Sequence, residues 1–377
     1  LLGLHDEFSL YAAVALSKML PDPEPAIWRL ARLVEGWGRV HLVERLSTTS
    51  TAEIKDWLLR EGYRNSIMHE YLAFACATGG NLKAALLAPA VDDALIDAAG
   101  EIVEALIQGG PAKDIDDYAD AAIVLQRYVE LVASGTPRLG RFLAVHAILL
   151  YLERESWDQL ARAANGWTEH QRAELIARAQ QVIQDSRWPP LVAQALESTD
   201  RTEAYRADQA ARVLGIDTWD VNWRQLRAEP FQSGHWYQIM RDVSPDRIRQ
   251  VVDFALEVLP LDEVATGPAD ELGLGPRFEV HSCLEFILQG LSAFPDVGWP
   301  LLEAALRSPV VRERHKALAV LADWGQDHWK PAVRDALHAA EVVEPNAEVR
   351  KHIGNVLRGE PYDSSVRWPS DTDENGA

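Results

Sequence analysis

The residues of this chain best suited to acid–base chemistry are Glu70, Asp242 and His281. A carboxylate or an imidazole can exchange a proton with a substrate when the fold holds it within hydrogen-bond reach. In this interpretation the three groups would act on a small molecule in a pocket enclosed by helices. We carry such an enzyme as the alternative function rather than the favoured one, because no catalytic motif accompanies these residues.

Metal and nucleophile motifs are incomplete in this sequence. His69-Glu70 has the order of a helical zinc motif, but residue 73 is alanine, where a second histidine would have to stand. The carboxylates at 262, 263, 270 and 271 are too irregularly spaced for a calcium loop. Gln232-Ser-Gly-His235 has the wrong flanks for a nucleophile elbow. We therefore expect no metal, no cofactor and no catalytic residue in the favoured interpretation.

An aromatic cluster is the strongest candidate for molecular recognition. Trp219, Trp223, Trp236 and Tyr237 fall within 19 residues, and the first two are four apart, hence on one helix face. Tryptophan is enriched at binding hot spots because a rigid ring buries a large area at low entropic cost. The same rings could instead fill a joint where regular helix stacking breaks. In the alternative enzyme they would line the pocket.

Charged residues in two later segments complete the predicted binding surface. Arg312 and Arg314 lie in a segment that resembles the segment around Arg350-Lys351. Such residues could bind an acidic partner, or they could form salt bridges between the two segments. Pro260 to Pro276 is long and rich in Gly and Pro, which is typical of a flexible lid or contact loop. The predicted surface comprises Trp219, Trp223, His235, Trp236, Tyr237, Asp270, Glu271, Arg312 and Arg314.

The elements that must position these residues are helices. Apolar residues recur at helical spacing along nearly the whole chain, and no stretch shows the alternation of a strand. Val311-Arg312 overlays Val349-Arg350 at a spacing of 38 residues, with a helical hairpin between them. Self-similarity at such a period predicts a stacked helical solenoid. We expect an all-α fold of antiparallel hairpins.

Breaks in the helical pattern divide the chain. We expect an N-terminal array over 1–185, a C-terminal array over 200–358 with a long loop at 260–277, and a disordered acidic tail over 359–377. Trp188-Pro189-Pro190 is expected to break the helical pattern between the arrays. Within the N-terminal array, 115–132 is predicted to be one long helix.

The segment 301–357, in which proline is followed by Val-Arg and then by apolar residues at helical spacing, resembles HEAT-type repeats. The resemblance is looser over 27–77 and 92–152. The segment from His235 to Arg312 is also similar to a bacterial group of HEAT-like proteins without established activity. The resemblance implies an α-solenoid whose curved surface grips other macromolecules. A DNA-repair glycosylase of HEAT-like type is a third hypothesis.

The charge balance favours a protein partner. The 377 residues include 57 acidic and 37 basic side chains, for a net charge of −20. Nucleic acids are bound largely through Lys and Arg, so this balance argues against them. An acidic surface suits a basic protein partner, or it simply keeps the protein soluble, which is the plainer interpretation. We expect a cytoplasmic scaffold or sequestering protein that has no membrane span and keeps Cys76 and Cys283 as buried thiols.

Overall fold

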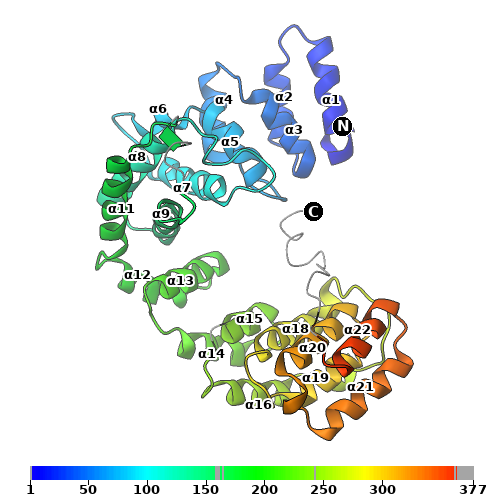
Figure 1. Cartoon of the computed structure of the whole chain (residues 1–377). Helices are drawn as coiled ribbons and strands as arrows, with labels where there is room; N and C mark the ends of the chain where they lie inside the picture. The colour runs from blue at the N-terminus through cyan, green and yellow to red at the C-terminus, as the bar shows by residue number, and fades with distance from the viewer. Residues whose placement is uncertain (1, 158–161, 164, 242, 361, 363–377) are drawn as a thin grey trace. The chain divides into compact units, whose positions relative to one another are not determined.

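The computed structural model describes residues 2–157, 162–163, 165–241, 243–360 and 362. This part of the chain contains 21 α-helices and no β-strand, so the all-α prediction is confirmed (Figure 1). Short 3₁₀ and π turns connect some of the helices. Both cysteines are buried free thiols, as expected. The expected acidic tail lies mostly outside the described residues, which end at 360 and 362.

The chain forms two compact units, which divide between Ile216 and Asp217. The helices of the first unit are α1 (Asp6–Met19), α2 (Glu24–Ala31), α3 (Gly36–Leu46), α4 (Ala52–Trp57), α5 (Glu70–Gly79), α6 (Leu82–Leu86), α7 (Asp93–Gln108), α8 (Ala121–Ser134), α9 (Leu139–Leu152), α11 (Glu169–Ile183), α12 (Trp188–Leu196) and α13 (Arg201–Val213). The sequence placed the break earlier, between 185 and 200.

Two helix boundaries differ from the prediction. Proline residues explain the first difference, and a polar turn residue explains the second. Pro189 and Pro190 do not break a helix but stand in the first turn of α12, where the missing amide hydrogen costs nothing. The expected helix over 115–132 is shorter, because turns occupy 115–120 and α8 begins only at Ala121. Asp114 caps that turn by accepting a hydrogen bond from the amide of Asp116 (2.8 Å).

In the first unit, alternate helices pack in succession. α1 packs on α3, α3 on α5, α5 on α7 and α7 on α9, and α9 in turn contacts α11 and α13. A second set lies beside them, with α2 on α3, α6 on α8 and α8 on α11. Helix α7 is therefore enclosed by α5, α8 and α9, and most of its apolar side chains are buried.

The helices of the second unit are α14 (Trp219–Ala228), α15 (Ser233–Arg241), α16 (Ile248–Val258), α17 (Leu261–Val264), α18 (Glu279–Leu291), α19 (Trp299–Leu306), α20 (Val311–Trp324), α21 (Pro331–Val343) and α22 (Ala347–Leu357). The same succession recurs: α15 packs on α18, α18 on α20 and α20 on α22, while α17, α19 and α21 follow one another beside them. One continuous apolar core runs through this unit.

A recurring turn precedes α20 and α22. The side chains of Ser308 and Glu344, each followed by proline, accept a hydrogen bond from the amide two residues on (both 3.0 Å). The backbone carbonyls of the same two residues accept hydrogen bonds from Arg314 (2.6 Å) and Arg350 (3.0 Å). The two turns are equivalent at an offset of 36 residues. The overlay of the Val-Arg pairs at 38 residues was therefore two residues out of register.

The long connection of the second unit is not a free loop. Its backbone is hydrogen-bonded to the turn before α20, from the amide of Gly267 to the carbonyl of Arg307 (2.8 Å) and from the amide of Glu271 to the carbonyl of Pro309 (3.1 Å). The amide of Val311 returns a bond to Glu271 (3.2 Å), which closes a single β-bridge between residues 271 and 310. The hypothesis of a flexible lid or contact loop stays a prediction, and the structure adds that the backbone of this stretch is bonded to the turn before α20 and to its first residue.

Candidate functional site

A charged groove follows one side of helix α7 in the first unit. It consists of two adjoining hollows of about 450 and 420 Å³, and both are lined by Glu101, Glu104 and Arg206. The first hollow is completed by Arg64, Asp97, Pro137, Arg138, Leu139, Gly140, Arg141, Leu191 and Glu203. The second is completed by Ile67, Met68, His69, Glu70, Ala105 and Gln108. We refer to these as the arginine-lined hollow and the Glu70 hollow.

Helix α7 supplies the floor of the groove through a polar stripe. Asp97, Glu101, Glu104 and Gln108 are three or four residues apart, which places them on one face of the helix. Asp92 fixes the start of α7 by accepting a hydrogen bond from the amide of Leu95 (2.8 Å). The remaining faces carry the apolar residues that α5, α8 and α9 cover.

The guanidinium groups of the arginine-lined hollow are already paired with carboxylates. Arg138 and Arg141 each contact a different oxygen of Asp97 at 2.6 Å. Arg141 is fully buried and also donates to Asp93 (2.8 Å) and to the carbonyl of Thr136 (2.9 Å). Buried guanidinium groups are stable only with such partners. These arginines therefore build the wall of the hollow.

Glu101 is the centre of a second network. It accepts a hydrogen bond from the hydroxyl of Tyr63 and contacts Arg64 (3.3 Å) and Arg206 (3.5 Å). Burial and the bond to Glu101 raise the pKa of Tyr63 well above its usual value, so the phenol stays protonated and donates. Arg206 also contacts Glu203 at 3.1 Å. Each of these positive charges thus has a negative partner.

Glu104 differs from its neighbours because the structure gives its carboxyl no ion pair or hydrogen bond. Burial raises its pKa to about 7, and the charge on Glu101 adds to this effect while Arg206 opposes it. Glu104 also borders a third hollow of about 440 Å³, formed with Ile107, Gln108, Ala147, Leu150, Tyr151 and Arg154. This carboxyl is therefore half-ionised near neutral pH at the junction of three hollows.

A buried phenol lies beneath the same stripe. Tyr128 is fully buried, and its hydroxyl has no hydrogen-bond partner in the described structure. A Cβ atom built on Gly100, one turn before Glu104, would lie 2.3 Å from this hydroxyl. Burial raises the pKa of Tyr128 well above its usual value, and Glu104 contributes the largest electrostatic effect. The absence of a side chain at Gly100 thus leaves the space that the phenol oxygen occupies beside α7.

The structure describes two of the three predicted acid–base residues, and these two belong to different units. Glu70 borders the Glu70 hollow in the first unit, where it opens α5 and is largely buried. Asp242 lies outside the described residues. His281 belongs to the second unit, where its Nδ1 is 3.0 Å from Glu313 and 3.4 Å from the hydroxyl of Ser308. Both groups approach the same ring nitrogen, so this cluster cannot relay a proton as a catalytic triad does.

The aromatic cluster packs into the second unit. Trp236 is fully buried, and its indole NH donates to the carbonyl of Pro230 (2.7 Å). Trp219 and Trp223 stack at 5.6 Å between ring centres, and Trp223 meets Phe254 at 5.3 Å. Both are partly buried against the core. The prediction of Trp236 as a contact residue is wrong, because its ring fills the joint between α14, α15 and α16.

The other residues of the predicted binding surface fall into two groups. Arg314 is 1% exposed and pairs with Glu344, so its assignment to a surface is also wrong. Arg312 contacts Glu285 (2.8 Å) and is largely covered. His235, Tyr237, Asp270 and Glu271 remain at least partly exposed. Asp270 accepts a hydrogen bond from Asn346 (3.0 Å), and Glu271 contacts Arg277 (3.1 Å).

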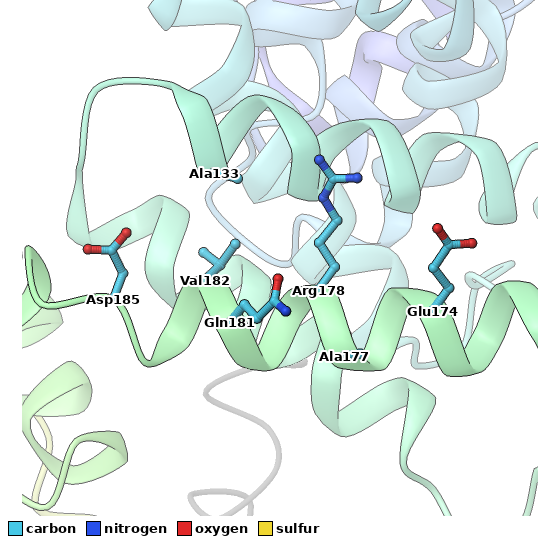
Figure 2. A pocket seen from close by; sticks show the side chains of 7 residues that line it. All are labelled: Ala133, Glu174, Ala177, Arg178, Gln181, Val182 and Asp185. Carbon is cyan, nitrogen blue, oxygen red and sulfur yellow. The ribbon is translucent and has the colours of Figure 1, made fainter.

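A separate hollow between α8 and α11 is a weaker candidate. Figure 2 shows Arg178 extending from α11 toward α8, with Glu174 and Asp185 further along the same side. Arg178 is 3.7 Å from Glu130, and Asp185 is 3.6 Å from Arg187. The remaining lining residues are Ala133, Ala177, Gln181 and Val182. The charges here are paired at the surface, and no buried polar group faces the hollow, so we assign it no role.

Comparisons with protein-family models and with curated sequences identify no relative of this chain. No protein-family model matches the chain, and no curated protein sequence is detectably similar to it. In the described ranges, no helix is both long enough and apolar enough to cross a membrane. No set of three or more His, Cys, Asp and Glu side chains among these residues could hold a metal ion.

Sequence reasoning missed most of the groove. It singled out Glu70 but not Tyr63, Glu101, Glu104, Tyr128 or Arg206. The available signal was the stripe at 97, 101, 104 and 108, which interrupts an otherwise apolar helix. Such a stripe is typical of any solvent-facing helix surface, so only the neighbouring helices reveal it as a groove floor.

Proposed function

We propose that this chain is a non-catalytic protein-binding protein built from stacked helical hairpins of HEAT-like type. Two observations support the repeat architecture: alternate helices pack in succession within each unit, and the proline turn recurs before α20 and α22. Each repeat of such an array contacts its neighbours and leaves an extended surface for a partner. The partner of this protein is a basic protein.

The observation that carries the binding function is the charge arrangement of the groove along α7. The arginines of this groove are paired with carboxylates. Among the described residues, neither Glu104 nor Glu70 has an ion pair, although both line the groove. The two hollows are lined by four arginines and five carboxylates, so the groove has one acidic group in excess, and the whole chain has a net charge of −20. A positive surface is complementary to such a groove.

A catalytic role has less support. The alternative enzyme required a pocket lined by tryptophan rings, but Trp236 is enclosed in the core, and Trp219 and Trp223 stack on each other. Of its proposed acids and bases, Glu70 and His281 belong to different units, and Asp242 lies outside the described residues. We therefore favour recognition over catalysis, with the groove replacing the aromatic cluster as the contact surface.

Affinity capture with matched charge reversals tests this function. The immobilised protein would be compared with the Glu70→Lys/Glu104→Lys variant and with a control that carries Glu174→Lys and Glu303→Lys, two charge reversals outside the groove. A basic protein should be retained by the parent and the control, released by salt and lost from the groove variant. Equal capture by all three proteins, or retention of acidic proteins only, would contradict the proposal.

A further inference from the structure

Two carboxyl groups without an ionic partner line the same hollow. Glu70 reaches it from the start of α5 and Glu104 from the middle of α7. Neither carboxyl forms an ion pair or a side-chain hydrogen bond among the described residues, although both are largely removed from water. The carboxylate oxygens of both residues remain accessible from the hollow, so an incoming cation can reach them.

We propose that the Glu70 hollow binds the cationic head of a basic side chain, a guanidinium or an ammonium group, between Glu70 and Glu104. This inference rests on the proposed function, because it names the groove position at which a basic partner inserts one arginine or lysine.

The chemistry of the hollow selects a cation over an anion. Its one guanidinium, Arg206, is already placed 3.5 Å from Glu101 and 3.1 Å from Glu203. An anion would have to compete with these carboxylates, whereas a cation would meet Glu70 and Glu104, which have no ion pair in the described structure, and would be repelled only by Arg206. A bare metal ion fits poorly, because the described carboxylates and histidines do not converge closely enough to hold one. A flat guanidinium can bridge carboxylates that are further apart.

The apolar part of the hollow fits the stem of such a side chain. Ile67, Met68 and Ala105 line it together with the carboxyl groups. Lysine and arginine bury their methylene stems against apolar surface while the charged head seeks a polar partner. A hydrophobic wall beside two carboxylates therefore matches an arginine or lysine better than it matches a small hydrated ion.

The Tyr128 hydroxyl lies near the polar stripe of α7 but does not line the hollow. It is a fully buried donor without an acceptor, and buried polar groups are nearly always satisfied. Gly100 leaves it room at the edge of the polar stripe, one turn before Glu104. Glu104 raises the pKa of Tyr128, so a cation that holds Glu104 in its ionised form also holds the phenol in its protonated form.

Binding of a cation at this position is coupled to the loss of a proton from Glu104. Burial holds the pKa of Glu104 at about 7, so a bound cation must displace a proton from about half of the molecules at neutral pH. The other titratable and charged groups that face Glu104 are Tyr63, Arg64, His69, Glu70, Asp97, Glu101, Tyr128, Arg138, Arg141, Tyr151, Arg154, Glu203 and Arg206. If only the ionised form binds, the dissociation constant tightens about tenfold from pH 6 to pH 8.

The probe is N-acetyl-argininamide, with N-acetyl-lysinamide as the ammonium counterpart, added to the full chain. Carbon-13 NMR of labelled glutamate carboxyls should show the pKa of Glu104 falling by one unit or more at saturating probe. Calorimetry should show the tenfold pH dependence. Glu104→Gln and Glu70→Gln should each weaken binding at least fivefold, whereas the matched control Glu174→Gln should bind as the parent does. His69→Gln should keep the pH dependence.

The inference is overturned if the Glu104 titration does not move with the probe, or if Glu104→Gln and Glu174→Gln bind it equally. The NMR measurement uses the unaltered chain, so a folding defect in a variant cannot rescue the idea. Capture of a basic protein that survives Glu104→Gln would leave the proposed function standing while this site fails. Probe binding with the expected pH dependence but no captured basic protein would uphold the site and contradict the function.

Discussion

Arg314 and Glu344 form an ion pair in the second unit, and each side chain is 1% exposed. Nη2 of Arg314 donates to one carboxylate oxygen (3.0 Å), and Nε lies 2.9 Å from the other oxygen without well-directed hydrogen-bond geometry. Nη1 donates to the carbonyl of Ser308 (2.6 Å), so one side chain joins the turn before α20 to the turn before α22. The pair therefore connects the segment before α20 to the segment before α22.

Removing one member of this pair should be strongly destabilising. Arg314→Met leaves Glu344 buried without a counter-charge, and we expect it to lower the free energy of unfolding by about 3–5 kcal/mol. Urea denaturation would measure the change. Arg358→Met, which removes an exposed pair with Glu360, is the matched control and should cost less than about 1 kcal/mol. Equal effects of the two changes would refute the structural role.

Two adjacent aromatic residues should respond in opposite ways to truncation. Trp236 is fully buried, whereas Tyr237 is 39% exposed. We expect Trp236→Ala to cost about 3–5 kcal/mol, since it leaves a large cavity in the core. Tyr237→Ala should cost clearly less. Thermal unfolding followed by circular dichroism would compare them, and a small effect of Trp236→Ala would mean that its ring is a surface contact after all.

Gly100 offers a test of the buried phenol. Replacing a glycine inside a helix by alanine normally stabilises the protein by up to about 1 kcal/mol. Here the new Cβ would lie 2.3 Å from the Tyr128 hydroxyl, so Gly100→Ala should destabilise instead. Combining it with Tyr128→Phe removes the colliding oxygen and should recover part of the loss. A double-mutant cycle in urea measures this coupling, and strictly additive effects would contradict the predicted collision.

His315 should make the protein less stable in acid. Its ring is buried beside His352 and Tyr362, and burial lowers its pKa to about 4, with His352 and Arg314 adding to the effect. The neutral form is thus favoured in the folded state, while the unfolded chain takes up a proton near pH 6.5. The contribution of His315 is present above pH 6.5 and is lost as the pH falls toward 4.

The expected loss from this residue is roughly 3 kcal/mol between pH 6.5 and pH 4. Urea denaturation at several pH values would measure the slope. In His315→Gln the slope over this range should be smaller than in the parent, whatever the variant's stability at pH 7. His338→Gln, at an exposed position, should keep the parent slope. An unchanged slope in His315→Gln would exclude this residue as the cause.

The sequence was informative about helices because glycine and proline act locally. Gly109, at a φ of +71°, ends α7 as its position in the sequence predicts. The same reasoning was wrong at Pro189-Pro190, since proline also suits the first turn of a helix. Local rules thus indicate that a boundary is near without saying whether a helix ends or begins there.

The site was harder to predict because its properties are tertiary. Trp236 was predicted to be a contact residue because tryptophan is enriched at binding sites. In the structure its ring is fully buried in the core of the second unit. Glu104 is an ordinary surface-type residue in the sequence. It acquires its unusual pKa only because α5, α9 and α13 cover the stripe to which it belongs. No spacing rule within one helix carries that information.

The fastening of 267–273 to α20 has a consequence for digestion by proteases. A protease must draw several residues of extended chain into its active site, and these residues are held by backbone bonds at Gly267 and Glu271. Gly273 carries a φ of +75° and leaves no room for a side chain beside Val310, which fixes the path of the chain further. Residues 267–273 should therefore resist proteolytic cleavage until the second unit unfolds.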